Sequence, residues 1–421
     1  MAEITNYKCS SCGGSLQFDS ARQKLICTSC GSEFEVSEFD STAASSGEVQ
    51  YEAKKDEWDV HGEGLVVYEC KNCGGEVVGD ETMASTKCPY CENPIVISSK
   101  FSGSLRPDLV IPFKMDKKAA EQELRNHVNK IKLAPGAFKA GNHISEVKGV
   151  YVPFWLFDAK VHASGNYDCE KIKKHSDSQY DYKETSYFDV YREADMAFQN
   201  VPADASKQMN DSLMDSIEPY DVRAAVPYSS AYMAGYLANK YDVTAQECQP
   251  RADKRMEHTA IELIRGQVKD YDAVHDKNHT FQKTSSSYKY ALYPVWILNT
   301  MWNGNKYTFA MNGQTGKLVG DVPYSKGKFF GIFFGVLLGV WAALLGIAFV
   351  ASGSIAATGI MGTGVIALIA ALVVSLSMKG KTKSVHKGTQ ALNFIVNGSF
   401  RLTNSYDNFI RKTEEKTPKN K

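Results

Sequence analysis

Two long apolar runs near the C-terminus constrain the 421-residue chain more than any other feature. Residues 329–350 form 22 positions without a charged side chain, and residues 360–378 form another 19. A helix rises 1.5 Å per residue, so about 20 apolar residues cross the ~30 Å hydrocarbon layer of a membrane. The segment between the runs, 351–359, is short and uncharged. The sequence therefore predicts a two-helix transmembrane hairpin over 326–378, with a buried helical hairpin in a soluble core as the alternative.

Lysines on both sides of this hairpin predict its orientation. Lys326 and Lys328 precede the first run, the connecting segment has no cation, and four lysines follow the second run, at Lys379, Lys381, Lys383 and Lys387. The positive-inside rule places both ends in the cytoplasm. We therefore expect a multi-pass protein of the inner (cytoplasmic) membrane. Near anionic lipid, each of the four lysines would contribute roughly 1 kcal/mol of attraction. They are interpreted either as lipid-facing residues or as determinants of topology alone.

Small residues recur at every fourth position in both apolar runs. They are Gly331, Gly335 and Gly339 in the first run, and Thr363, Ala367, Ala371 and Ser375 in the second. Small side chains let helix backbones approach closely in lipid. The pattern predicts either packing within the hairpin or an oligomer formed through the three glycines.

Eight of the ten cysteines occur as CxxC pairs, in an arrangement that repeats after 61 residues. The first copy holds Cys9, Cys12, Cys27 and Cys30, and the second holds Cys70, Cys73, Cys88 and Cys91. In both copies 14 residues separate the two pairs, which is typical of a zinc ribbon. Four thiolates complete a tetrahedral Zn²⁺ site and leave no position for water, so both sites are expected to be structural. The predicted reducing compartment disfavours disulfides.

Charge separates the two ends of the chain and indicates the kind of partner. Residues 1–100 carry 8 Lys/Arg against 17 Asp/Glu, whereas residues 379–421 carry 10 against 3. A Zn²⁺ ion with four thiolates adds a formal charge of −2 to each ribbon. Phosphate neutralisation dominates the affinity of nucleic-acid-binding proteins, and this acidic region would repel a phosphate backbone. Protein partners are therefore favoured over nucleic acid for the ribbons at 1–40 and 65–98, which a flexible acidic linker at 41–64 connects.

The middle of the chain, residues 99–325, predicts an α+β cytoplasmic domain. Asp116 is suited to cap a helix that runs to residue 130, and Thr244 with Glu247 forms a capping-box pattern before a second helix. A further helix is expected within 204–217. Similar segments at 151–158 and 293–299, each followed by a Gly/Asn turn, predict two antiparallel β-meanders with Trp and Tyr in the sheet core.

The basic tail, 379–421, contains Asn397-Gly398 between apolar residues, which predicts a β-hairpin that returns to the cytoplasmic sheet. Its last residues, from Lys412 onward, are expected to be disordered.

Common catalytic motifs are missing from the sequence. It has no GxxxxGK[ST], no GxSxG and no HExxH. We therefore predict a protein that is not an enzyme. Two alternatives stay open: a membrane-tethered nucleic-acid-binding protein, and a membrane-bound enzyme with an unrecognised site in 101–325.

An ordered set of motifs resembles the bacterial TFIIB-type zinc-ribbon membrane proteins, which are often mislabelled as primosomal-protein-N′-like. The motifs are CxxCGG with a second CxxC, Pro107-Asp-Leu-Val-Ile-Pro112-Phe, Tyr151-Val-Pro-Phe-Trp155, Pro219-Tyr220, Pro294-Val-Trp296, Asn312-Gly-Gln-Thr-Gly316-Lys and Gly398-Ser-Phe-Arg-Leu402. This chain departs from the pattern at Glu92 and Asn93, where the family has glycines. The resemblance implies an adaptor in the envelope-stress response that recruits phage-shock-protein-A-like or flotillin-type proteins to the membrane.

Overall fold

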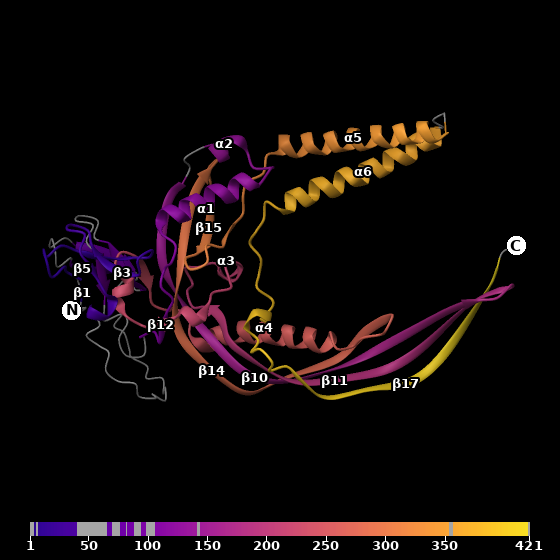
Figure 1. Cartoon of the computed structure of the whole chain (residues 1–421), viewed down its shortest axis with the longest axis horizontal. Coiled ribbons are helices and arrows are strands. Elements are labelled where there is room, and N and C mark those ends of the chain that lie inside the picture. Colours follow the sequence, from indigo (N-terminus) through magenta and orange to yellow (C-terminus); the bar gives the residue numbers. More distant parts are fainter. Residues whose placement is uncertain are drawn as a thin grey trace.

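The computed structural model describes residues 4–5, 7–39, 65–69, 76–80, 82–87, 94–97, 106–140, 144–352 and 357–419. They form a central body with two arms, one made of helices and one of long strands (Figure 1). The helical arm consists of α5 (Lys326–Ser352) and α6 (Ala357–Gly380). A small N-terminal ribbon lies on the side of the body away from the free ends of both arms (Figure 1).

A 12-stranded sheet forms the centre of the body. Its main path runs through β1 (Ile4–Thr5), β8 (Pro94–Ile97), β7 (Met83–Lys87), β13 (Leu237–Asn239), β10 (Ile144–Ser176), β14 (Ala273–Trp302), β15 (Asn305–Asn312) and β16 (Leu318–Gly320). Four more strands join it: β9 (Leu109–Val110), β11 (Tyr180–Asp204), β12 (Val226–Pro227) and β17 (Arg401–Pro418). Most neighbouring strands in this sheet are antiparallel.

Four of these strands are long enough to leave the body as a ribbon, which we call the β-arm (Figure 1). It comprises 159–176 of β10, 180–200 of β11, 273–289 of β14 and 401–418 of β17. In β10 every residue from Tyr151 to Phe157 is buried, whereas from Ala159 to Cys169 buried residues mostly alternate with more exposed ones. Continuous burial is typical of a strand covered on both faces, and alternation of a strand covered on one.

Helices cover the two faces of the sheet. The predicted helix α1 (Lys117–Lys130) is confirmed, and the Asp116 carboxylate accepts a 2.7 Å hydrogen bond from the Ala119 amide. α4 (Ala245–Arg265) begins at the predicted capping box and packs on β10 and β11. α2 (Gly136–Ala140) is a short helix after α1. The third helix is shorter than expected: α3 spans only Asp211–Ser216, because residues up to Asp204 continue β11.

The prediction of two separate meanders is wrong for the first one. Tyr151 pairs with Pro294, so the two similar segments are neighbours in one sheet, and Gly165 lies inside β10 instead of in a turn. The second meander, β14–β15–β16, is confirmed. Tyr151 and Tyr293 are completely buried in the sheet core, as the sequence predicts.

The tail also differs from its prediction. Gly398 has a positive φ of 75° and occupies a turn, but no hairpin forms around it. Instead Ile395 bridges to Phe198, and β17 pairs with β11 along its length. The expectation that the tail returns to the sheet is therefore correct, whereas residues 412–418 are strand and not disordered. Hydrogen bonding to β11 holds these residues in a strand, although the polar sequence of the tail does not predict one.

The helical arm exposes its apolar side chains. By length and composition, α5 and α6 are both apolar enough to cross a membrane. In the most apolar 18-residue stretch of each helix, 0% of the residues of α5 and 17% of those of α6 are buried. Ala367, Ala371 and Ser375 of α6 are buried. In the described part of the chain α6 packs mainly against α5, so α5 covers these small side chains. A Cβ at Gly331, Gly335 or Gly339 would have nothing within 4 Å. These three glycines therefore face away from α6, and packing within the hairpin does not explain them.

Candidate metal centre

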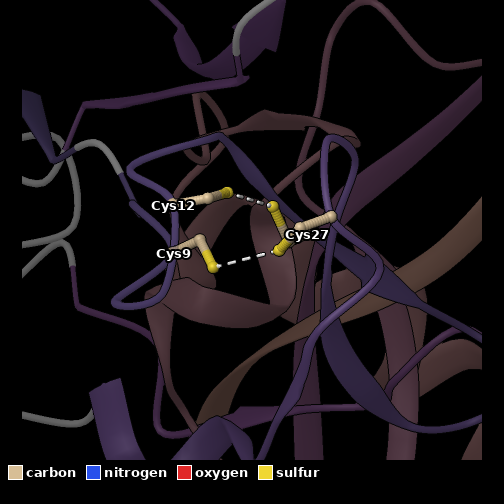
Figure 2. A group of neighbouring side chains, drawn as sticks. Cys9, Cys12 and Cys27 are labelled. Atoms are coloured by element: carbon tan, nitrogen blue, oxygen red, sulfur yellow. Dashed lines mark hydrogen bonds between the residues drawn. The ribbon is translucent and has the colours of Figure 1, made fainter.

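The four cysteines of the first copy meet in a small ribbon of three strands, β2 (Leu16–Asp19), β3 (Lys24–Cys27) and β4 (Glu33–Phe34). All four sulfur atoms lie within 4.8 Å of one another. The Sγ atoms of Cys9 and Cys30 are 3.6 Å apart, and those of Cys12 and Cys27 are 3.5 Å apart. Figure 2 shows the side chains of Cys9, Cys12 and Cys27 pointing toward one another. The geometry matches a site for one metal ion, as predicted.

Two turns with the same hydrogen-bond pattern position these thiols. In the first, the Cys9 amide donates to the Gly14 carbonyl (2.7 Å) and the Gly13 amide donates to the Cys9 carbonyl (2.8 Å). In the second, the Cys27 amide donates to Ser32 (2.9 Å) and the Gly31 amide donates to Cys27 (3.0 Å). Gly13 and Gly31 have φ of 73° and 75°, in the left-handed region that glycine adopts readily. Each CxxC pair thus needs the glycine that follows it.

Electrostatics within the cluster favour a cation. The hydroxyl and the amide of Ser32 hydrogen-bond to Cys30 and lower the pKa of its thiol to about 6. At Cys12 the Gly14 amide lowers the pKa, but the neighbouring thiols of Cys30 and Cys27 raise it more, to about 12. One thiolate therefore opposes ionisation of the next. A divalent cation at the centre would offset this repulsion, because a coordinating thiol is deprotonated by the ion.

The ribbon packs on the body and is not a free finger. The Phe18 amide donates to the Ala234 carbonyl (2.9 Å), and the Phe18 ring lies 5.0 Å from that of Tyr232. The Gln23 side chain donates to the Phe113 carbonyl at 2.7 Å. Cys9 and Cys27 face this buried side, whereas Cys12 and Cys30 are exposed. Metal binding would therefore stabilise a surface module that is already attached to the sheet.

The second copy of the cysteine pattern lies outside the described residues. This holds for Cys70, Cys73, Cys88 and Cys91, and for the linker at 41–64. Strands beside these cysteines are described: β5 (Leu65–Glu69) pairs with β6 (Glu76–Asp80). β7 pairs with β13 and β8 pairs with β1, both in the central sheet. The strands at the end of the second copy thus belong to the body.

The predicted basic residues begin where the helical arm joins the body and continue toward α4. Lys379 lies in the last turn of α6, Lys381 and Lys383 follow it, and Lys387 lines a cavity beside α4; all four are exposed. The Lys379 ammonium lies 5.0 Å from the centre of the Tyr324 ring. Lys328, at the start of α5, donates to the Ala134 carbonyl at 2.7 Å. Lys328 and Lys379 are therefore at the base of the two apolar helices, where a lipid headgroup layer would lie if these helices span a membrane.

Sequence reasoning missed a buried ion network next to α4. Arg255 donates to the Glu218 carboxylate at 3.1 and 2.5 Å, and both side chains are at most 7% exposed. Arg251 binds Asp204, which is also buried. Burial raises the pKa of Glu218 to about 7 and that of Asp204 to about 6, against the lowering effect of the arginines. The paired residues are far apart in the sequence, so no local sequence pattern predicts the ion network.

The segment after α6 docks onto this network. The Gly388 amide donates to Asp215 (3.0 Å), the Ala391 amide donates to Thr259 (2.7 Å), and Arg255 donates to the Gln390 carbonyl (3.2 Å). A cavity of about 780 Å³ lies beside it, lined by residues that include Asp204, Arg251, Lys254, His258 and Lys387. The chain is thus fixed to the body between the helical arm and β17.

A second polar cluster lies on the β-arm. His162 contacts Asp195 through Nδ1 (2.8 Å) and Glu193 through Nε2 (2.7 Å). The hydrogen bond to Asp195, followed by the effect of Glu193, raises the pKa of His162. Arg401 of β17 contacts Asp195 as well, at 3.2 Å. This cluster ties three strands together on the face opposite α4.

Fold and site together define a sheet-rich protein with a four-cysteine cluster that could hold a metal ion and two helices that are candidate membrane spans. No family model and no solved structure matches the chain. The chain is 32% identical over 342 residues to the uncharacterized protein YdjG of Bacillus subtilis (strain 168), and the match covers 81% of this chain and 96% of that protein. The chain belongs to the family of that protein.

Proposed function

We propose that the chain is a membrane-anchored zinc-ribbon adaptor that recruits cytoplasmic proteins to the inner membrane. The observation that carries the proposal is the exposure of α5 and α6, whose most apolar stretches are 0% and 17% buried. Soluble monomers rarely expose an apolar surface of this extent, because water solvates it poorly. A bilayer would cover both helices, and the body would then lie at the membrane surface.

Contacts at the base of the hairpin support an anchor that is firmly joined to the body. The Val322 amide donates to the Thr382 carbonyl (2.9 Å), and the Ser325 amide donates to the Leu133 carbonyl (2.9 Å). Both helices therefore enter lipid from the same place on the body. The exposed lysines near this base favour the cytoplasmic side, with both termini there and the short uncharged connection at 351–359 on the other side.

Zinc is the proposed metal, with one ion in each copy of the cysteine pattern. Four thiolates at mutual distances within 4.8 Å suit a tetrahedral ion of this softness. A complete thiolate shell leaves no open position for substrate, so the proposed role is to hold the ribbon's shape. The second ion would be held by Cys70, Cys73, Cys88 and Cys91.

The proposed partners are proteins. Glu33, Glu35 and Glu38 are exposed on the first ribbon. Glu33 pairs with Arg22 and Glu35 with Lys24, so these two cations are already neutralised and offer little to a phosphate backbone. The family resemblance suggests phage-shock-protein-A-like or flotillin-type proteins as candidates. The basic residues at the hairpin base would contact lipid headgroups instead.

A pull-down from membranes in mild detergent tests the proposal. It compares the intact chain, a variant with all eight CxxC cysteines changed to Ser, and a control in which only Cys169 and Cys248, both buried outside the ribbons, are changed to Ser. We expect the same associated cytoplasmic proteins with the intact chain and the control, and their loss from the eight-cysteine variant. Recovery of these proteins with the eight-cysteine variant, or of nucleic acid in their place, would contradict recruitment through the ribbons.

Topology has its own test. Protease added outside intact spheroplasts should leave the N-terminal hundred residues uncut. Cleavage there would show that the ribbons face the wrong side for the proposed partners.

A further inference from the structure

The β-arm has two open edges. Of the described strands, β17 pairs only with β11. On the other side, residues 273–289 of β14 pair only with β10 in the described part of the chain. Each edge carries main-chain N–H and C=O groups with no described strand beside them, which makes it a template for another strand. The arm is therefore an incomplete sheet on both sides.

Natural edge strands block pairing by being short, by carrying proline or charged side chains, by bulging, or by being covered by other elements. The two edges of the β-arm show only some of these features: the β11–β17 pairing has two register shifts, between Tyr187 and Phe188 and between Glu193 and Ala194. β17 is 18 residues long and has its only proline at the last position. The arm part of β14 contains no proline, and each of its lysines is ion-paired within the chain: Lys277 with Asp168 and Asp189, Lys283 with Asp253, and Lys289 with Asp158. Lysines occur on the distal part of β17, at positions 412 and 416, but its first ten residues have none.

That lysine-free part of β17 exposes large apolar side chains. Leu402 is 40% exposed, Tyr406 42%, Phe409 59% and Ile410 55%. On β14, Tyr288 is 45% exposed. Cross-strand pairs of aromatic and β-branched residues stabilise sheets by roughly 0.2–1 kcal/mol each. A neighbouring strand would cover these side chains as well as pair the backbone.

The directions of the two edge strands suit a second copy of this chain as the partner. The order across the arm is β14-β10-β11-β17, and every neighbouring pair is antiparallel. β14 and β17 therefore run in opposite directions. If a second copy lies beside the first in the same orientation, its β14 meets β17 of the first copy as an antiparallel neighbour. The alternation then continues from one copy to the next without a break.

The contact is long enough to be specific. About 16 paired residues at ~3.3 Å each give an edge of roughly 53 Å, and a sheet layer is about 10 Å thick. One edge would thus bury roughly 500 Å² on each copy, or about 1,000 Å² in total, which is the lower bound for a specific interface. In a head-to-tail assembly each copy would use both of its edges.

We propose that copies of this chain assemble by pairing β17 of one copy with the 273–289 segment of β14 in the next. This contact is separate from the outward-facing glycines of α5 and does not depend on the proposed recruitment of cytoplasmic proteins. It is heterologous, so repetition gives a ring if the rotation between copies closes, and an open array if it does not.

Photo-cross-linking of the full-length chain in mild detergent tests the pairing. A photoreactive phenylalanine analogue replaces Phe409, and unlabelled protein is mixed with ¹⁵N-labelled protein before illumination. We expect cross-linked peptides that join position 409 of one isotopic population to residues 273–289 of the other. Cross-links confined to the same copy, to a different protein, or to another region of the second copy would overturn the proposal.

Self-association of variants gives an independent readout. Phe409→Lys combined with Ile410→Lys should weaken assembly about tenfold or more, since two apolar edge residues become charged. Met301→Lys is the matched control, because Met301 is also 48% exposed but lies outside the arm edge. Gly335→Leu tests the hairpin glycines. A monomeric intact chain, or assembly that Gly335→Leu abolishes and the double lysine variant does not change, would refute edge pairing.

Discussion

Removal of the buried Arg255 should cost the body much more stability than removal of an exposed arginine. Its guanidinium lies between the Glu218 carboxylate and the carbonyls of Pro202 (2.9 Å) and Gln390 (3.2 Å). The Arg255 side chain is 4% exposed and that of Glu218 is 7% exposed. Arg255→Met keeps most of the volume but leaves the carboxylate and two carbonyls without this donor.

The expected loss follows from this burial. Breaking a buried ion pair on one side typically costs about 3–5 kcal/mol, because the remaining charge is left without a partner. For a body of this size, each kcal/mol lowers Tm by roughly 2–4 °C, so Arg255→Met should lower Tm by about 10 °C. Arg223→Met is the control, since Arg223 pairs with Asp221 but its side chain is 92% exposed. It should cost under about 1 kcal/mol.

The loss should also depend on pH. The pKa of Glu218 is about 7 in the folded chain, raised by burial from its ordinary value of 4.5. A raised carboxyl pKa means that the folded state binds the proton more tightly, so stability falls as pH rises from 4.5 to the folded pKa. Without Arg255 that pKa rises further. Between pH 7 and pH 8 the variant should therefore lose about 1 kcal/mol more than the intact chain.

Thermal unfolding in mild detergent measures the change in Tm, and urea unfolding followed by tryptophan fluorescence measures the free-energy differences at each pH. The double variant Arg255→Met, Glu218→Gln should recover part of the loss and remove the extra dependence on pH. The reasoning is refuted if Arg255→Met costs no more than Arg223→Met, or if the double variant is less stable than Arg255→Met at every pH.

Three further predictions concern the metal, the backbone and the β-arm. Elemental analysis of the purified chain should give two Zn²⁺ per chain, and one after the first four cysteines are changed to Ser; an unchanged ratio would exclude the first site. Gly320→Ala should cost about 2–4 kcal/mol in thermal unfolding, because its φ is +157° and its Cβ would lie 2.2 Å from the buried Phe309 ring. Gly304→Ala, at φ +76° in open space, should cost only about 1 kcal/mol. The pKa of His162 is raised chiefly by Asp195, so its contribution to stability is complete below about pH 6.5 and is lost as pH rises through the folded pKa. The difference in unfolding midpoint between the intact chain and His162→Gln should therefore shrink from pH 6 to pH 8, and a constant difference would contradict it.

The sequence by itself determined the features that depend on neighbouring residues. The charge-free runs identified α5 and α6, because helix length and polarity are local properties. Asp116 and the Thr244–Glu247 pair marked helix starts, because capping involves residues three positions apart. The spacing of Cys9, Cys12, Cys27 and Cys30 identified the four-cysteine cluster, because each CxxC turn brings two thiols together without help from the rest of the chain.

Only the tertiary structure decided which segments lie together over long separations. β11 takes β17 as its partner across more than 200 residues, past the helical arm, and this converts a polar tail into a strand. The Arg255–Glu218 pair, the docking of the ribbon on the body and the outward direction of the α5 glycines arise in the same way. Strand pairing and burial depend on which surfaces of the folded chain meet. An alternating sequence can form a strand, but it does not determine which other strand it pairs with.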